Sequence, residues 1–200
     1  EEFVGVHPAG VVDYYVIGSP SGPYFTGGFA GVPIWVVRGY HRAGPGGTGS
    51  AKAGGNYAAS LLPQIEAERR GFSQVCFLDT YEEKYLEELG GMNMFVVMAD
   101  GSVRTPELSG VILEGCTRSA ILRLLRDDGV GVCEERIALD DLVAGIRSGA
   151  VAEVFACGTA AVVTPISRLA SDDFDVELPV GDVTRRIHER LTDIQMGRAE

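Results

Sequence analysis

Positive charge is scarce in this sequence of 200 residues, in which 17 lysines and arginines stand against 28 aspartates and glutamates. The formal net charge is −11, and the isoelectric point calculated from the sequence is near 4.7. Binding to a nucleic-acid backbone or to an anionic lipid surface relies on lysine and arginine to displace counterions. We therefore expect neither nucleic acid nor a membrane among the partners of this protein.

Long apolar runs and paired cysteines are lacking as well. No stretch approaches the ~20 consecutive apolar residues of a membrane helix, and no charged segment followed by an apolar one resembles a secretory signal. The four cysteines are far apart, form no CxxC and have no histidine at ligand spacing. That pattern argues against a zinc site and against a disulfide framework. The sequence thus predicts a cytoplasmic protein with reduced thiols and no bound metal.

The remaining composition is that of a folded domain, with 46% hydrophobic and 22% charged residues. The chain begins at Glu1 rather than at methionine, and the stretch 19–31 has the Gly/Pro-rich composition of a connector. We therefore interpret residues 1–18 as the remnant of a small N-terminal domain and 19–31 as an interdomain connector. Residues 32–200 are long enough to form a domain with its own core.

Segments of strand composition alternate with segments of helical periodicity. Strands are predicted where β-branched and aromatic residues cluster, at Val12–Ile17, Ile34–Val37, Gln74–Leu78, Met94–Met98, Val132–Ile137 and Glu153–Ala156. Helices are predicted from apolar spacing at Asn56–Arg70, Thr117–Asp128, Leu139–Ser148 and Val183–Met196. In the first helix, Leu61, Leu62 and Ile65 are expected on the apolar face, and Pro63 is expected to kink or weaken it. The mixture indicates an α/β fold without a simple βαβ repeat.

The most unusual stretch is 44–56, GPGGTGSAKAGGN, where glycines surround Lys52. A lysine that reacts with a ligand carbonyl must approach it closely in a desolvated pocket, and glycines permit that approach. By composition alone, a flexible surface loop with an exposed lysine is the favoured interpretation. A phosphate-binding GxxxxGK[ST] loop is excluded, because Ala51 and Ala53 flank the lysine.

Four segments together resemble the cofactor-site signatures of branched-chain aminotransferases, class IV enzymes that use pyridoxal 5'-phosphate. These segments are AKAGGNYAASL at 51–61, EELGGMNMFVV at 87–97, TPELSGVILEGCTR at 105–118 and VFACGTAAVVTPI at 154–166. They follow the family's order and approximate spacing, and the resemblance extends from about Gly18 to Gly197. It implies the α/β fold of the large cofactor-binding domain, which is like that of D-amino-acid aminotransferase. In that fold, mixed sheets form a pseudo-barrel surrounded by helices.

The resemblance implies roles around the cofactor ring for three residues. Lys52 matches the lysine that carries pyridoxal 5'-phosphate and moves the proton during catalysis. Glu88 matches the acid that pairs with the pyridine nitrogen, and Tyr57 matches the tyrosine that hydrogen-bonds the phenolic oxygen. Without the motifs, Glu88 would be interpreted as one more solvated acid in the run from Glu82.

Further residues are implied for the phosphate and for the substrate. Cys116 and Thr117 open a predicted helix, whose unpaired N–H groups favour an anion such as the phosphate. Thr159 matches a second phosphate contact through its hydroxyl, and the amides of Thr159 and Ala160 match the pair that receives the substrate carboxylate. Tyr24 resembles a tyrosine that lines the substrate pocket.

The implied reaction is transamination of branched-chain, small aliphatic L-amino acids with 2-oxoglutarate, by a homodimer when the protein is full length. Another class IV enzyme is left open: a D-amino-acid aminotransferase, an aminodeoxychorismate lyase or a specialised biosynthetic aminotransferase. A non-catalytic binding or assembly protein that retains the fold is also left open. The EELGGMN segment favours the branched-chain group.

The sequence also departs from the family's pattern. Gly91 stands where other members have threonine, which puts one water-mediated phosphate contact in doubt. The family's small domain supplies an arginine for the phosphate and part of the side-chain pocket, and residues 1–18 are too short to contain it. We therefore expect the 200 residues alone to be inactive.

Overall fold

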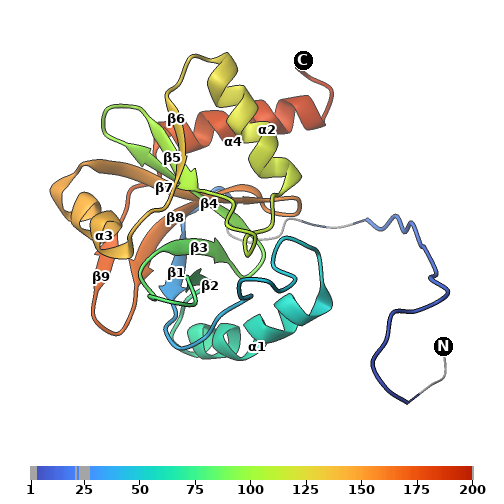
Figure 1. The fold of residues 1–200 in the computed structure, drawn as a ribbon. Helices are drawn as coiled ribbons and strands as arrows, with labels where there is room; N and C mark the ends of the chain where they lie inside the picture. Colours follow the sequence, from blue (N-terminus) through green and yellow to red (C-terminus); the bar gives the residue numbers. More distant parts are fainter. Residues whose placement is uncertain (1–3, 21, 23–27, 200) are drawn as a thin grey trace.

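A computed structural model describes residues 4–20, 22 and 28–199 of the chain. Within these ranges the strands are β1 Val32–Val36, β2 Gln74–Leu78, β3 Leu86–Leu89, β4 Asn93–Met98, β5 Val103–Pro106, β6 Val132–Glu135, β7 Val151–Gly158, β8 Val162–Ala170 and β9 Asp175–Glu177. The helices are α1 Gly54–Arg69, α2 Cys116–Asp127, α3 Leu139–Ser148 and α4 Asp182–Gln195. Figure 1 shows the helices arranged around the strands.

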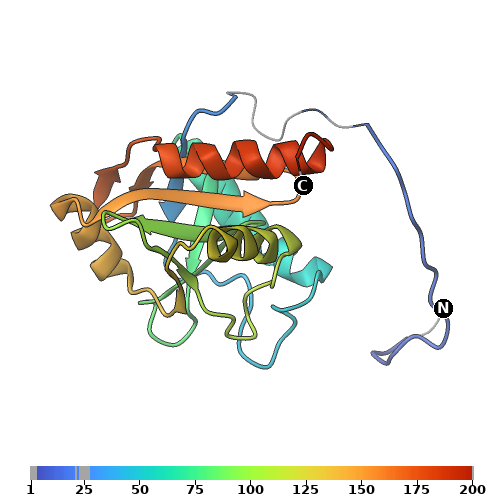
Figure 2. The same ribbon diagram turned by 90° about the horizontal axis from the view of Figure 1, so that it is seen from above.

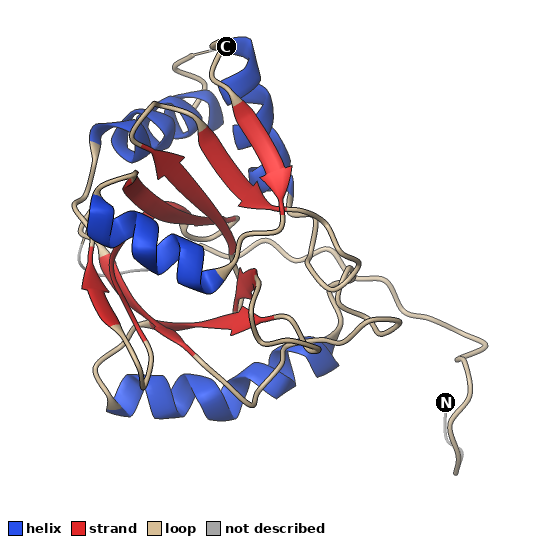
Figure 3. Cartoon of the chain, turned by 60° about the vertical axis from the view of Figure 1, so that its left-hand side comes forward, coloured by secondary structure: helices blue, strands red, loops and turns tan. Residues whose placement is uncertain are grey.

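The strands form one mixed sheet in the order β3-β2-β1-β8-β7-β4-β5-β6, with β9 added to β8. Strand β1 runs parallel to both β2 and β8, whereas β7 is antiparallel to both β8 and β4. The sheet curls, with α1, α2 and α4 on its outside, whereas α3 packs against the core inside the curl (Figures 2 and 3). The curled mixed sheet with four helices confirms the predicted α/β fold.

Most central strands are buried on both faces, because the inside of the curl and its outside are each covered. In β4, Met94 and Val96 join the core inside the curl, and Phe95 and Val97 join a second core with α2 and α4. In β1 and β2 the alternate residues pack beneath α1 in a third core. Successive side chains of a strand point to opposite faces, so these strands are apolar throughout.

All four helices predicted from the sequence are present, each within two residues of its predicted bounds. Five of the six predicted strands are present too. The prediction of a strand at Val12–Ile17 is wrong, because this segment forms neither helix nor strand and its side chains are exposed. An extended segment becomes a strand only when a neighbour pairs its N–H and C=O groups, and none of the described residues pairs with this one.

The predicted apolar face of α1 is also wrong. The residues that α1 buries are Asn56, Ser60, Pro63 and Ala67, whereas Leu61, Leu62 and Ile65 are 45–62% exposed. Small side chains on the packed face let α1 lie close to β2. The helix is continuous through Pro63. In the part of the chain that the structure describes, no helix is both long and apolar enough to cross a membrane.

Candidate active site

Lys52 lies in an exposed turn two residues before α1 begins at Gly54. Its Nζ atom is 5.0 Å from the centre of the Tyr57 ring, so the structure brings these two predicted site residues together. The turn is fixed by Asn56, whose amide donates to the carbonyl oxygens of Thr48 at 2.8 Å and Ala51 at 3.0 Å. The Thr48 hydroxyl donates in return to the Asn56 amide oxygen. Lys52 therefore stands on a hydrogen-bonded turn rather than on a flexible loop.

The glycine-rich segment packs directly against the loop that leads to α2. A Cβ atom at Gly49 would collide with the Cα atom and the carbonyl oxygen of Val111, so no side chain fits at this position. Glycine at this position lets two backbone segments come close, whereas the predicted approach of a ligand to Lys52 stays a prediction. The contact places the segment carrying Lys52 against Val111.

Glu88 points from β3 into this junction and is almost fully buried, with 3% of its surface exposed. Its Oε1 atom lies 2.6 Å from Nη2 of Arg42 and accepts the backbone N–H of Leu113 at 2.8 Å. Burial raises the pKa of the Glu88 carboxyl to about 7, although Arg42, the Leu113 N–H and Lys52 all favour the ionised form. Glu88 is therefore not part of a solvated acidic run.

Arg42 is a site residue that the sequence did not reveal. It is 3% exposed, and its Nη2 atom donates to the carbonyl oxygens of Gly49 and Val111 as well as contacting Glu88. Its Nη1 atom is buried without a hydrogen-bond partner among the described residues. A single guanidinium thus joins three segments around Glu88. The one sequence signal was an arginine next to the glycine-rich stretch in an acidic chain.

The predicted phosphate site lies at the N-terminus of α2, which begins at Cys116. Gly115 precedes it with φ 62°, and no side chain caps the helix, so its first N–H groups stay available to an anion. Cys116 is exposed and Thr117 half-buried. Asn93 anchors this end by donating to the carbonyl oxygen of Leu113.

Thr159 and Ala160 are exposed in the turn between β7 and β8. Gly158 precedes them and is tightly packed, since a Cβ atom there would lie 3.2 Å from the Met92 side chain. After the turn, Val162 has φ 56°, a conformation that is costly for a β-branched residue. Strained backbone of this kind is often found at functional sites.

Register links this turn to the other elements of the site. Asn93 in β4 pairs with Cys157 in β7, next to Gly158, and also holds the loop before α2. The α2 N-terminus and the β7–β8 turn are therefore anchored on two adjacent strands. Tyr24, predicted to line the substrate pocket, lies outside the described residues.

The fold and these motifs agree with comparisons to known proteins. The sequence model of the family described as amino-transferase class IV matches residues 20–169. The chain belongs to the class IV aminotransferase family. It is 50% identical over 203 aligned residues to the branched-chain-amino-acid aminotransferase of Mycobacterium tuberculosis, a match that covers 98% of this chain and 55% of that protein.

Solved structures of class IV aminotransferases resemble the chain as well. The branched-chain aminotransferase from Thermoproteus uzoniensis with norvaline is 32% identical, with a TM-score of 0.75 over 90% of this chain and 56% of that one. The T.th. branched-chain amino acid aminotransferase complexed with N-(5'-phosphopyridoxyl)-L-glutamate is 34% identical, with a TM-score of 0.69 over 84% of this chain and 53% of that one. The chain thus spans about half the length of the relatives it matches.

Proposed function

We propose that residues 32–200 form the pyridoxal-phosphate-binding large domain of a branched-chain-amino-acid aminotransferase. The observation that carries this proposal is Glu88, a carboxylate buried beside an arginine and within electrostatic reach of Lys52. A buried acid whose pKa is raised by desolvation next to specific charged partners is typical of a functional site. Similarity to an aminotransferase at 50% identity supports the same activity.

The residues present fit pyridoxal 5'-phosphate. Lys52 offers an exposed amine for covalent attachment, and Tyr57 beside it offers a phenol for the phenolic oxygen. Glu88 would pair with the pyridine nitrogen and hold a proton there, while Arg42 keeps Glu88 in place. The uncapped N-terminus at Cys116 and Thr117, together with the Thr159 hydroxyl, would hold the phosphate. When bound, the cofactor supplies an electron sink for the carbanion at the substrate carbon.

The substrates follow from the relatives. One neighbour was solved with norvaline, an unbranched aliphatic amino acid, and another with a phosphopyridoxyl group joined to glutamate. They support a small aliphatic L-amino acid as donor and 2-oxoglutarate as acceptor, with the Thr159 and Ala160 amides receiving the carboxylate. In this reaction the Lys52 amine would take the proton from the α-carbon of the substrate and deliver it to the cofactor carbon that carries the amino group.

A different class IV activity or a non-catalytic binding role is the second candidate. The intact set of Lys52, Tyr57, Glu88 and Thr159 favours catalysis over a binding role. A cytoplasmic location and a homodimer of the full-length protein remain part of the proposal, as do the connector at 19–31 and a small-domain remnant at 1–18. The acidic composition and the family resemblance support them.

Covalent trapping tests the cofactor assignment without any need for activity. The chain is incubated with pyridoxal 5'-phosphate, reduced with borohydride and digested, and the pyridoxyl group is located by mass spectrometry. We expect the label on Lys52 and its loss in Lys52→Ala. Lys84, the other lysine of the chain, provides the control, because Lys84→Ala should label like the wild type. Label mainly on Lys84 would refute the assignment.

Turnover of leucine, isoleucine and valine with 2-oxoglutarate tests the activity itself. We expect transamination by the protein extended to the length of its relatives. The 200 residues alone should turn over little, because a site open to water handles a carbanion badly. Equal rates for the two proteins would contradict the division into large and small domains.

A further inference from the structure

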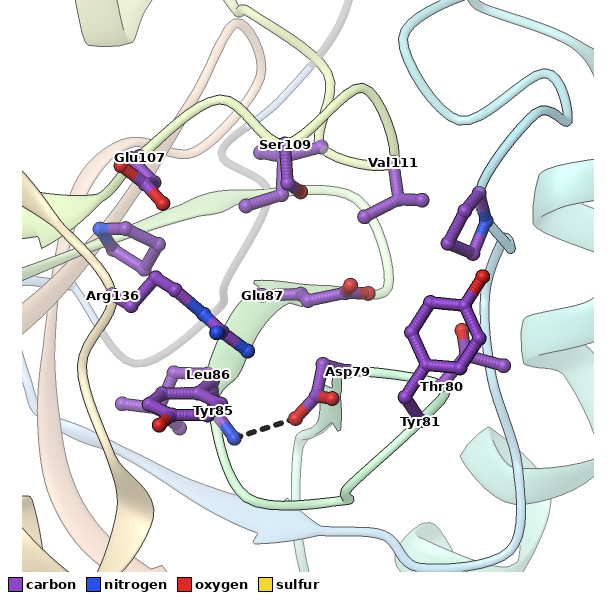
Figure 4. A pocket seen from close by; sticks show the side chains of 13 residues that line it. Asp79, Thr80, Tyr81, Tyr85, Leu86, Glu87, Glu107, Ser109, Val111 and Arg136 are labelled. Carbon is purple, nitrogen blue, oxygen red and sulfur yellow. Dashed lines mark hydrogen bonds between the residues drawn. The ribbon is translucent and has the colours of Figure 1, made fainter.

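A cavity of about 330 Å³ lies next to the candidate active site but does not include Lys52 or Glu88. It is bounded on one side by residues 79–87 and on the other by the loop that follows β5, at Glu107, Ser109 and Val111 (Figure 4). Glu87 and Glu88 are consecutive in β3, so their side chains leave opposite faces of the strand. Glu88 faces Arg42, whereas Glu87 faces this cavity.

Glu87 is a buried acid without a partner. It is 7% exposed, and among the described residues its carboxylate has no hydrogen bond and no ion pair. Burial, Asp79 and Glu88 raise the pKa of the Glu87 carboxyl to about 7, although Arg42 favours its ionised form. A buried carboxylate is normally paired with a donor, because desolvation without compensation is costly. Glu87 therefore lacks the donor that a ligand in the cavity would provide.

The other charged residues that line the cavity are Asp79, Glu107 and Arg136. The Asp79 carboxylate is held by the backbone N–H groups of Glu82, Lys84 and Tyr85, which lower its pKa although burial opposes them. Arg136 is the one cationic residue that lines the cavity in the described part of the chain. Its guanidinium lies over the Tyr85 ring, with 3.6 Å between the guanidinium carbon and the ring centre.

Leu86, Val111 and Ile112 contribute apolar surface to the cavity. A volume of about 330 Å³ is at the small end of ligand pockets, which span ~300–1,000 Å³, and suits a compact molecule. The described residues offer no group of three metal-ligating side chains, so a small organic cation fits better than a metal ion.

We propose that this cavity binds a free aliphatic α-amino acid. Its ammonium group would donate to Glu87 and Asp79, its carboxylate would accept from Arg136, and its side chain would pack on Leu86 and Ile112. The ligand's ammonium group provides the donor that Glu87 lacks. Both the ammonium and the carboxylate of the ligand then have a partner of opposite charge. This second site is separate from the transamination site and does not depend on the proposed function.

Binding is measured by calorimetry on the cofactor-free Lys52→Ala chain, with three probes of similar shape. L-leucine should bind saturably. 3-Methylbutylamine, which has no carboxylate, should bind more weakly and be insensitive to Arg136→Gln. 4-Methylpentanoate, which has no ammonium, should not bind. Glu87→Gln should weaken the affinity for L-leucine at least ~10-fold, in keeping with the loss of one charge-assisted hydrogen bond.

Glu177→Gln is the matched control, since Glu177 is exposed in β9 and far along the chain from the cavity. Ser109→Trp is a second variant that fills the cavity mouth from an exposed position without touching Glu87, and it too should abolish leucine binding. Leucine affinity that survives both Glu87→Gln and Ser109→Trp would overturn the proposal, as would the absence of saturable binding. Trapping on Lys52 is unaffected by either outcome, so the two proposals fail independently.

Discussion

Arg42 shows how much of the candidate site depends on one side chain. Nearly the whole residue is buried. Its Nη2 atom contacts the Glu88 carboxylate and donates to two backbone carbonyl oxygens, and its Nη1 atom has no hydrogen-bond partner among the described residues. Such an arginine is costly to bury and is stabilised only by the partners it finds. Its removal would leave Glu88 as an unpaired buried charge.

We expect Arg42→Met to lower the free energy of unfolding by about 3–5 kcal/mol, the usual cost of breaking a buried ion pair. Arg42→Lys should recover part of that loss but not the double carbonyl contact. Urea unfolding measures both. Arg123→Met is the control, because Arg123 is 84% exposed and its pair with Asp127 contributes little. Equal losses for Arg42→Met and Arg123→Met would show that the buried pair is not stabilising.

For Glu88→Gln in the full-length protein, we expect the cofactor to stay bound while transamination slows by ~10²-fold or more. The amide cannot hold a proton on the pyridine nitrogen, but it keeps the size of the side chain. Glu82→Gln, an exposed acid in the same run, should behave like the wild type. Coupled turnover and the cofactor's absorbance separate the two effects. Normal turnover in Glu88→Gln would exclude the role assigned to it.

At the scale of residues, sequence motifs predicted which side chains to examine but not what surrounds them. Lys52, Tyr57 and Glu88 were all predicted, and the structure places Lys52 beside Tyr57 and within electrostatic reach of Glu88. Their roles stay predictions. Arg42 and Asn56 were not predicted, because their partners are backbone atoms that no residue pattern displays.

Helix α4 takes its N-terminal cap from a distant strand. The Glu153 carboxylate in β7 accepts the backbone N–H groups of Val183 and Thr184 and the Thr184 hydroxyl. Gly181 precedes the helix, and a Cβ atom there would collide with the Glu153 carboxyl group. The carboxylate thus replaces the side-chain cap that α4 lacks and ties the helix to the sheet.

Glu153→Gln should lower the free energy of unfolding by about 1.5–3 kcal/mol, because charge-assisted hydrogen bonds to helix N–H groups are lost. Thermal and urea unfolding followed by circular dichroism measure the loss. Glu189→Gln, exposed on α4 itself, is the matched control and should change little. A Glu153→Gln chain as stable as that control would mean that the cap is unimportant.

At the scale of elements, helices could be predicted better than strands. Each helix carries a periodic pattern of its own, whereas a strand depends on partners distant in sequence. Strand β3 was missed because Glu87 and Glu88 make it look solvated, and β8 was missed because Pro165 and Arg168 interrupt its apolar run. In α1 the true packing face is small and polar, which hydrophobic spacing cannot detect.

The whole molecule should be most stable at mildly acidic pH when no ligand is bound. The Glu87 and Glu88 carboxyls each have a pKa of about 7 when folded against an ordinary 4.5, so folding favours their protonated forms. This stability is fully present below pH 4.5 and is lost as the pH rises to about 7. Asp79 and Glu134 act in the opposite direction, because their pKa values are lowered and their contribution is lost on further acidification.

Urea midpoints between pH 4 and 8 test this prediction. The free energy of unfolding of the wild type should fall between about pH 5 and pH 7. That of Glu87→Gln should fall less over the same range, because the amide does not titrate. Glu177→Gln, an exposed acid, should follow the wild type. Parallel curves for the wild type and Glu87→Gln would show that Glu87 titrates normally.

The position of β1 in the sheet determines when the fold can close. β1 begins at residue 32, and its parallel neighbour β8 begins at residue 162. During synthesis, β1, β2 and β3 can pair early, and β4 with β5 soon after, but no strand pairs the two groups into one sheet until β7 and β8 have left the ribosome. Such distant pairing slows folding and leaves strand edges open in the meantime. While residues 107–150 are made, the nascent chain therefore carries two separately paired groups of strands with open edges, the state in which a chaperone would protect it.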